Sequence, residues 1–235
     1  MNNQTLQIKL KQRLNKLASN DYDNIECWQI IEAFNKVQIE WIRRQLHGNN
    51  LFKEGDESSK RRIDDLQPLL TELPLTGVSN DTYFQTTNFP VDDYLEYKRV
   101  TAYATSECCP DPRTMVVYLS ESANVDLVMR DPLKNPSYNW AETFCTMIAN
   151  TIRIYRNIEF QISGALFTYY RKPINIQILG CQNPYTGIVS TTDIICEFKD
   201  DVVELLLDDT ASLIAGDIDN FNQATRTQQA SEKNN

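Results

Sequence analysis

The chain has 235 residues, of which 41% are hydrophobic and 10% aromatic, enough to build a buried core. Its formal net charge of −9 excludes a general nucleic-acid binder, because neutralising phosphates requires clustered Lys and Arg. No apolar run approaches the roughly 18 residues of a membrane span, and residues 1–5 lack the basic and apolar regions of a signal peptide. We therefore expect a soluble protein made in the cytosol, with no membrane partner.

The N-terminal part predicts two helices. Leucines at three- and four-residue spacing indicate an amphipathic helix over residues 4–18, with a basic exposed face. Asp23 and Glu26 fit the N-cap and N3 positions of a second helix that runs to about Leu46. The apolar surface of this second helix is wider than one core face needs. It is covered either by the neighbouring helices or by another subunit.

A third helix is predicted over residues 59–70, and it opens on Lys60, Arg61 and Arg62. A basic triplet suits a helix N-terminus poorly, because the helix dipole is positive there. These side chains are therefore either solvated or paired with acidic groups from elsewhere.

From Pro74 the pattern changes to β-branched and aromatic residues, which predict strands. Pro136 and Ser137, by contrast, predict the start of a helix over residues 138–148 that places Trp140, Phe144 and Met147 on one side. The strands are predicted at 95–105, 114–120, 151–155 and 160–170, with residues 108–112 connecting the first two.

After Phe198 the sequence predicts one amphipathic helix, with Asp201, Glu204 and Asp208 on its exposed face. The polar residues 222–235 predict a tail that orders only on contact with a partner. The expected fold class is α+β, with N-terminal helices, a small and mostly antiparallel sheet with an inserted helix, and a C-terminal helix. The expected organisation is a helical region 1–73, a β-rich core 74–196, a C-terminal helix 197–221 and a flexible tail 222–235.

The cysteines predict reduced, mostly buried thiols, because no C-x-x-C pair and no export signal occur. Adjacent Cys108 and Cys109 are either a redox pair or two ordinary thiols beside a turn at Pro110 and Pro112. The full set is Cys27, Cys108, Cys109, Cys145, Cys181 and Cys196.

The sequence holds no recognisable catalytic pattern. His47 is the single histidine, so a zinc site of the usual Cys/His spacing or a His-dependent triad would have to include it. Neighbouring acids such as Asp64 and Asp65 point to different sides of a helix or a strand, which makes each pair a weak acid–base candidate. A glycine-rich phosphate loop is missing too. We predict a protein that is not an enzyme, with no catalytic residue, metal ligand or cofactor.

Several segments resemble the neck proteins of crAss-like tailed bacteriophages. They are Pro136 to Trp140, Thr151 to Tyr155, Leu166 to Pro173, and Cys196 to Phe198 followed by the acidic helix. The resemblance covers about residues 90–215. It implies a head-to-tail connector: a ring of about twelve copies that contacts the portal protein and other neck or tail rings, surrounds the DNA channel, and resides in the virion after assembly in the host cytoplasm. A tail terminator, another virion protein, or a cytosolic ligand-binding or protein-binding module remain as alternatives.

Charge is unevenly distributed in a way that suits a ring. Residues 1–62 carry 11 Lys and Arg against 8 Asp and Glu, a net charge of +3, whereas residues 191–235 carry 3 against 10, a net charge of −7. A ring needs two different, complementary surfaces on each copy. We predict subunit-interface roles for Lys60, Arg61, Arg62, Arg171 and Lys172, and an acidic face at Asp201, Glu204 and Asp208 that lines either the DNA channel or an interface.

Overall fold

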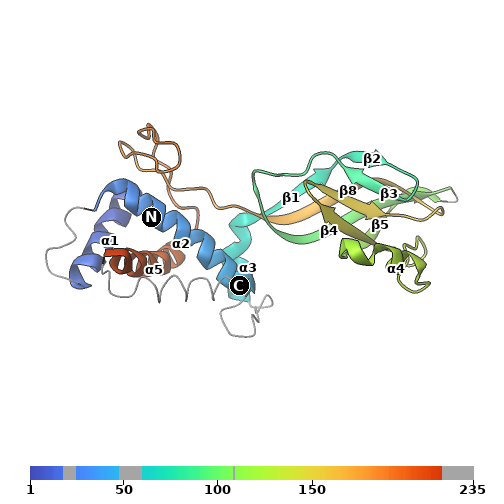
Figure 1. The fold of residues 1–235 in the computed structure, drawn as a ribbon, viewed down its shortest axis with the longest axis horizontal. Helices are drawn as coiled ribbons and strands as arrows, with labels where there is room; N and C mark the ends of the chain where they lie inside the picture. Colours follow the sequence, from blue (N-terminus) through green and yellow to red (C-terminus); the bar gives the residue numbers. More distant parts are fainter. Residues whose placement is uncertain (18–24, 48–59, 108, 219–235) are drawn as a thin grey trace. The chain divides into compact units, whose positions relative to one another are not determined.

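A computed structural model describes residues 1–17, 25–47, 60–107 and 109–218 (Figure 1). The chain forms two compact units. The helical unit comprises Met1–Pro68 and Pro173–Asn235, and the β unit comprises Leu69–Lys172. The described part of the chain contains no helix that is both long enough and apolar enough to cross a membrane.

The helical unit contains the helices that the leucine and isoleucine spacings predict. Leu6, Leu10 and Leu14 are at most 1% exposed, which confirms the amphipathic first helix. Ile30 and Phe34 of the second helix are equally buried, so the unit itself covers this wide apolar face. The helices are α1 (Asn3–Leu17), α2 (Cys27–His47), α3 (Lys60–Leu66) and α5 (Asp200–Ile218), and a 3-10 turn, η1 (Gln67–Leu69), follows α3.

The irregular segment 173–199 belongs to the helical unit, although the sequence predicted most of it as part of the β core. Its two arms meet through backbone pairing of Gln177 with Ile194. The side chain of Asn3, 1% exposed, donates from Nδ2 to the carbonyl oxygens of both residues, at 2.9 and 3.0 Å. Buried Asn35 of α2 accepts a hydrogen bond from the backbone N–H of Ile176 at 2.9 Å. These long-range polar contacts hold the segment on the helices.

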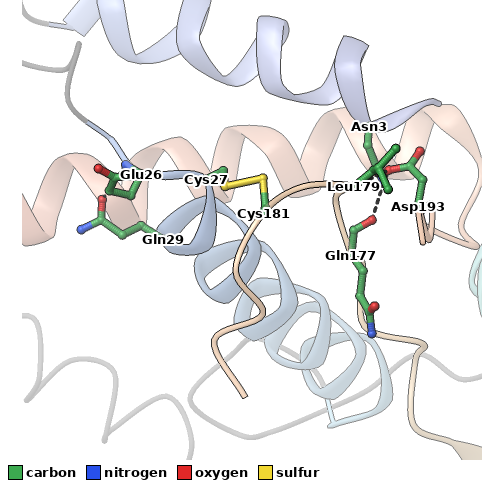
Figure 2. Close-up of a disulfide and its surroundings, with 8 residues drawn as sticks. All are labelled: Asn3, Glu26, Cys27, Gln29, Gln177, Leu179, Cys181 and Asp193. Atoms are coloured by element: carbon green, nitrogen blue, oxygen red, sulfur yellow. Dashed lines mark hydrogen bonds between the residues drawn. A yellow bond between two sulfur atoms is a disulfide. The ribbon is translucent and has the colours of Figure 1, made fainter. Parts of the chain in front are cut away.

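A disulfide joins Cys27, at the start of α2, to Cys181 in this segment (Figure 2). Their Cα atoms lie 5.9 Å apart, although 154 residues separate them in sequence. The prediction of free thiols is therefore wrong for this pair, because only the fold brings the two cysteines together. It is confirmed for Cys145 and Cys196, which are free and buried. Cys108 lies outside the described residues.

The β unit is an eight-stranded, curled sheet in the order β1-β8-β4-β5-β6-β7-β3-β2. Every neighbouring pair is antiparallel except β5 and β6, which run parallel. The mostly antiparallel sheet is confirmed, but it is not small. The strands are β1 (Leu70–Leu75), β2 (Gly77–Ser79), β3 (Tyr83–Thr86), β4 (Tyr94–Ser106), β5 (Cys109–Leu119), β6 (Glu142–Ile148), β7 (Thr151–Tyr155) and β8 (Gln161–Arg171).

The helix predicted over residues 138–148 is wrong. A turn leads into strand β6 at Glu142, and β6 is buried on both faces from Thr143 to Thr146. A strand with two buried faces shows no alternation, so its short apolar run cannot be told from a helix by period alone. The inserted helix is instead α4 (Val125–Arg130), preceded by a 3-10 turn, η2 (Ser122–Asn124).

The predicted third helix also ends early. It stops at Leu66, and the chain enters strand β1 at Leu70 after Pro68. Proline lacks the backbone N–H that a helix interior needs. The β unit therefore begins a few residues before the predicted boundary at Pro74.

Strands β1 and β2 occupy opposite ends of the sheet order, although only Thr76 separates them in the sequence. The sheet must therefore curl until its two edges meet at this point. Gly77 lies at the crossing, where an added Cβ would come within 2.2 Å of the carbonyl oxygen of Gln85 and 2.9 Å of Phe84 Cζ. Only glycine allows this close approach of two backbones.

We expect Gly77→Ala to lower the free energy of unfolding of the β unit by about 1 to 3 kcal/mol, because the new methyl group overlaps backbone atoms. The matched control is Gly164→Ala in β8, where an added Cβ meets nothing within 4 Å. Urea unfolding and hydrogen exchange of β3 would measure both variants. Equal stabilities for the two variants would contradict the close approach.

Candidate functional site

The acidic face of α5 contacts α1 of the same chain. Glu204 accepts hydrogen bonds from Lys9 Nζ and from the Arg13 guanidinium, and Asp208 accepts one from Arg13 Nε. The Lys9 ammonium, with help from Arg13, holds the pKa of Glu204 below its usual range. The basic N-terminal and acidic C-terminal surfaces, which we expected to meet between copies, thus meet within one chain. A channel role for this face stays a prediction, with Asp201 exposed in the first turn of α5.

We expect the pair of Arg13 and Glu204 to be coupled by about 0.5 to 1 kcal/mol in a double-mutant cycle, because both side chains remain partly open to water. Since the pKa of Glu204 is lowered in the folded state, this contribution is present above the ordinary carboxyl pKa and is lost as the pH falls through the lowered value. Urea unfolding at neutral and acidic pH measures it. Exposed Glu121→Gln is the control, and a coupling insensitive to pH and salt would contradict the ion pair.

The predicted basic interface residues lie in both units. Lys60, Arg61 and Arg62 form the first turn of α3, and their side chains fall outside the described atoms. Arg171 Nη1 donates to the carbonyl oxygen of Lys172 at 3.1 Å, and Lys172 Nζ donates to that of Asp92 at 3.0 Å. The end of β8 is thereby tied to the loop before β4. An interface role for these five residues stays a prediction.

The candidate site lies in the β unit, where the parallel strands β5 and β6 require a crossover connection. Between this connection and the strands lies a hollow of about 570 Å³, which we call the β5–β6 hollow. Phe144 and Leu119 contribute apolar walls, whereas Lys134 and Glu142 are its charged groups. The remaining lining residues are Tyr118, Ser120, Val128, Pro132, Leu133, Asn135, Ser137, Trp140 and Thr143.

The rim of this hollow exposes large apolar side chains to water. Leu133 is 92% exposed, Trp140 81% and Tyr118 54%. Single exposed apolar residues are common, but a group of them around a concave surface is typical of a binding site. The sequence predicted Trp140, Phe144 and Met147 on one side of a helix. In the structure Trp140 and Phe144 form the rim and wall of the hollow, whereas Met147 packs against the core of the β unit.

Local hydrogen bonds fix the rim in place. The backbone N–H of Trp140 donates to Ser137 Oγ at 3.4 Å, and that of Leu133 donates to Asp131 Oδ1 at 3.0 Å. Ala141 has a φ of 56°, a left-handed conformation that is unusual for a residue with a Cβ. Its carbonyl oxygen accepts a hydrogen bond from Val116 at 2.8 Å, which anchors the turn on β5. The hollow is therefore formed before any partner binds.

The polar chemistry of the hollow is limited. Tyr118 Oη donates to Glu142 Oε1 at 3.2 Å, and this hydrogen bond to a carboxylate raises the pKa of Tyr118. Across the described ranges, no three His, Cys, Asp or Glu side chains gather as metal ligands do. The arrangement can bury an apolar side chain or ring and orient it with a few polar groups.

A second exposed apolar surface lies on the helical unit, on residues 178–190, which we call the 178–190 loop. Ile188 is 70% exposed, Leu179 62%, and Tyr185 and Val189 57% each. The segment contains no charged residue. In Figure 1 this loop is part of the irregular chain between β8 and α5, and the side chain of Tyr185 lies close to Glu32 and Asn35 of α2.

A disulfide and a backbone hydrogen bond hold the base of the 178–190 loop. Beside the disulfide at Cys181, the N–H of Ser190 donates to the carbonyl oxygen of Cys181 at 2.8 Å. At the tip, Asn183 accepts a hydrogen bond from the backbone N–H of Tyr185 through Oδ1, at 2.9 Å. Gly187, with a φ of 71°, supplies the left-handed residue that closes the turn. The loop thus presents its apolar side chains in a defined conformation.

Comparison of the sequence with protein-family models found no match, and comparison with curated proteins found none either.

Proposed function

We propose that this chain is a structural virion protein that forms a ring in the head-to-tail connector of a tailed bacteriophage. In this role it would join portal and capsid to the tail around the DNA channel. The single observation that supports the proposal most is the exposed apolar rim of the β5–β6 hollow, with Leu133 and Trp140 almost fully open to water. Covering an exposed side chain such as Trp140 with a partner protein contributes favourably to the free energy of binding.

Ring formation requires two different surfaces on one copy, because a head-to-tail contact joins unlike patches. The described residues supply a concave apolar surface on the β unit and a protruding one on the helical unit. They differ in shape and lie on different units, so each copy offers the two unlike patches that a head-to-tail contact joins.

The net charge of −9 fits a protein that surrounds DNA without holding it. An acidic channel repels the phosphate backbone and lets the duplex slide. The pairing of Glu204 and Asp208 with α1 reduces the acidic charge that α5 offers to a channel. Exposed Asp201 therefore becomes the first candidate on this helix for facing DNA.

The mass of the purified protein in solution tests the proposal. Light scattering at low and moderate salt, with and without the portal protein of the same phage, should detect either a ring or a monomer that becomes ring-sized when the portal is added. A strict monomer under every condition would contradict the proposal.

The β5–β6 hollow also supports a second candidate, a ligand-binding module. A volume of about 570 Å³ falls within the range of small-molecule pockets. Such a module would be a monomer, and an apolar dye would bind the hollow and quench Trp140 fluorescence. In a ring, the assembled protein would exclude the dye.

A further inference from the structure

We propose that the 178–190 loop of one copy inserts into the β5–β6 hollow of the next copy, and that this contact joins the ring. The inference rests on the proposed function, because it assumes that copies of the chain assemble with one another. The contact is carried by Ile188 and Val189 on the loop, and by Trp140 and Leu133 on the hollow.

The chemistry of the loop matches the chemistry of the hollow. A charged loop would lose its hydration on entering a hollow lined by Phe144, Leu119 and Val128, whereas residues 178–190 carry no charge. Ile188, 70% exposed, offers an aliphatic side chain that an apolar wall can cover. Val189, 57% exposed, adds a second aliphatic side chain beside it.

Both surfaces are organised before they meet, which lowers the entropy lost on association. The disulfide at Cys181 and the hydrogen bond to Asn183 hold the loop. The Ser137 and Asp131 contacts hold the rim of the hollow. A preformed protrusion and a preformed hollow can dock with little rearrangement.

Each copy carries both surfaces, the loop on the helical unit and the hollow on the β unit. A copy that has bound one neighbour through its loop therefore keeps its hollow for another. In a head-to-tail arrangement this contact is heterologous, and it repeats from copy to copy until the ring closes.

Complementary variants test the contact. Trp140→Asp alters the hollow only, and Ile188→Asp alters the loop only; both side chains are exposed, so the fold should survive. Each variant alone should lose assembly, with its dissociation constant raised at least about 30-fold. An equimolar mixture should form a dimer of two chains and nothing larger. In that dimer, the intact loop of the Trp140 variant occupies the intact hollow of the Ile188 variant.

The matched controls are Ile158→Asp, 97% exposed on the β unit outside the hollow, and Ile8→Asp, 59% exposed on α1. Both should assemble as the unmodified protein does. Rings formed by either test variant alone, or a mixture that stays monomeric while the unmodified protein assembles, would overturn the contact and leave the proposed ring in place. An unmodified protein that stays monomeric even with the portal would overturn the ring itself.

Photo-crosslinking tests the contact when assembly is weak. A benzoylphenylalanine at position 188, in a mixture of isotopically light and heavy chains, should crosslink to residues 132–144 of a chain of the other isotope. A crosslink within one chain, or to residues outside the hollow, would overturn the proposal. This readout works at high protein concentration without a stable ring.

Discussion

Replacing Phe167 by alanine should lower the free energy of unfolding of the β unit by about 3 to 5 kcal/mol, the usual range for a buried phenylalanine. Phe167 lies in β8 and is fully buried. Its ring lies 4.9 Å from that of Tyr169 and 5.7 Å from that of Phe89, with Tyr94 and Tyr97 at 6.0 and 5.9 Å. Alanine would leave a cavity at the centre of this cluster.

The measurement is thermal unfolding together with hydrogen exchange of β4 and β8, since a chain of two units need not unfold in one step. Val116→Ala, at a half-exposed position on the same sheet, should change stability by no more than about 0.5 kcal/mol. The loss of stability for Phe167→Leu should lie between those for Phe167→Ala and Val116→Ala. A loss below about 1 kcal/mol for Phe167→Ala would show that this aromatic cluster is not the core of the β unit.

Removing the disulfide should cause the second-largest loss of stability, and this loss should fall on the helical unit. We expect Cys181→Ser to cost about 2 to 4 kcal/mol, because a bond between residues 154 apart limits the freedom of the unfolded chain. It should also loosen the base of the 178–190 loop. Hydrogen exchange should therefore rise in residues 177–194 as well as in the N-terminal turn of α2.

Reduction provides a control that needs no second variant. A reducing agent should destabilise the unmodified protein by the same amount and leave Cys181→Ser unchanged. Disulfides persist in oxidising surroundings and are rare in the cytosol, so protein kept reduced from cell lysis onward should show the lower stability. If alkylation and mass measurement found Cys27 and Cys181 both free in protein exposed to air, the disulfide would be refuted.

The two free thiols that the structure describes should not take part in thiol–disulfide exchange. Burial raises the pKa of Cys145 to about 12 and that of Cys196 to about 11. Both therefore stay protonated near neutral pH, where the thiolate is the reactive form. This agrees with the reduced, buried thiols that the sequence predicted.

The local pattern of the sequence was enough to predict α1, α2, α5 and several strands, whereas α4 was not predicted and residues 138–148 were wrongly expected to be a helix. Leu6, Leu10 and Leu14 predicted α1, and the period of α5 was equally clear, because each pattern is complete within one segment. The alternation near 95–105 and the run at 151–155 predicted β4 and β7. The α+β class followed from these elements.

The candidate site depends on contacts between distant segments, which periodicity does not report. Strand β6 becomes a strand because it pairs with β5 and β7, and this pairing turns Trp140 from an expected helix residue into the rim of a hollow. The same limit applies to the charges of α5. Their composition indicated an exposed acidic face at a DNA channel or an interface, but only packing assigned Glu204 to Lys9 and Arg13 of the same chain.

The sequence by itself therefore determined the helices and strands whose pattern is complete within one segment, the α+β class and the acidic balance of the chain. The tertiary structure decided that Cys27 meets Cys181, that residues 173–199 fold with the helices, and that a hollow forms beside β5 and β6. The physical reason is that propensity and hydrophobic period act over a few neighbouring residues. Disulfides, ion pairs and concave surfaces form only where the fold brings distant residues together.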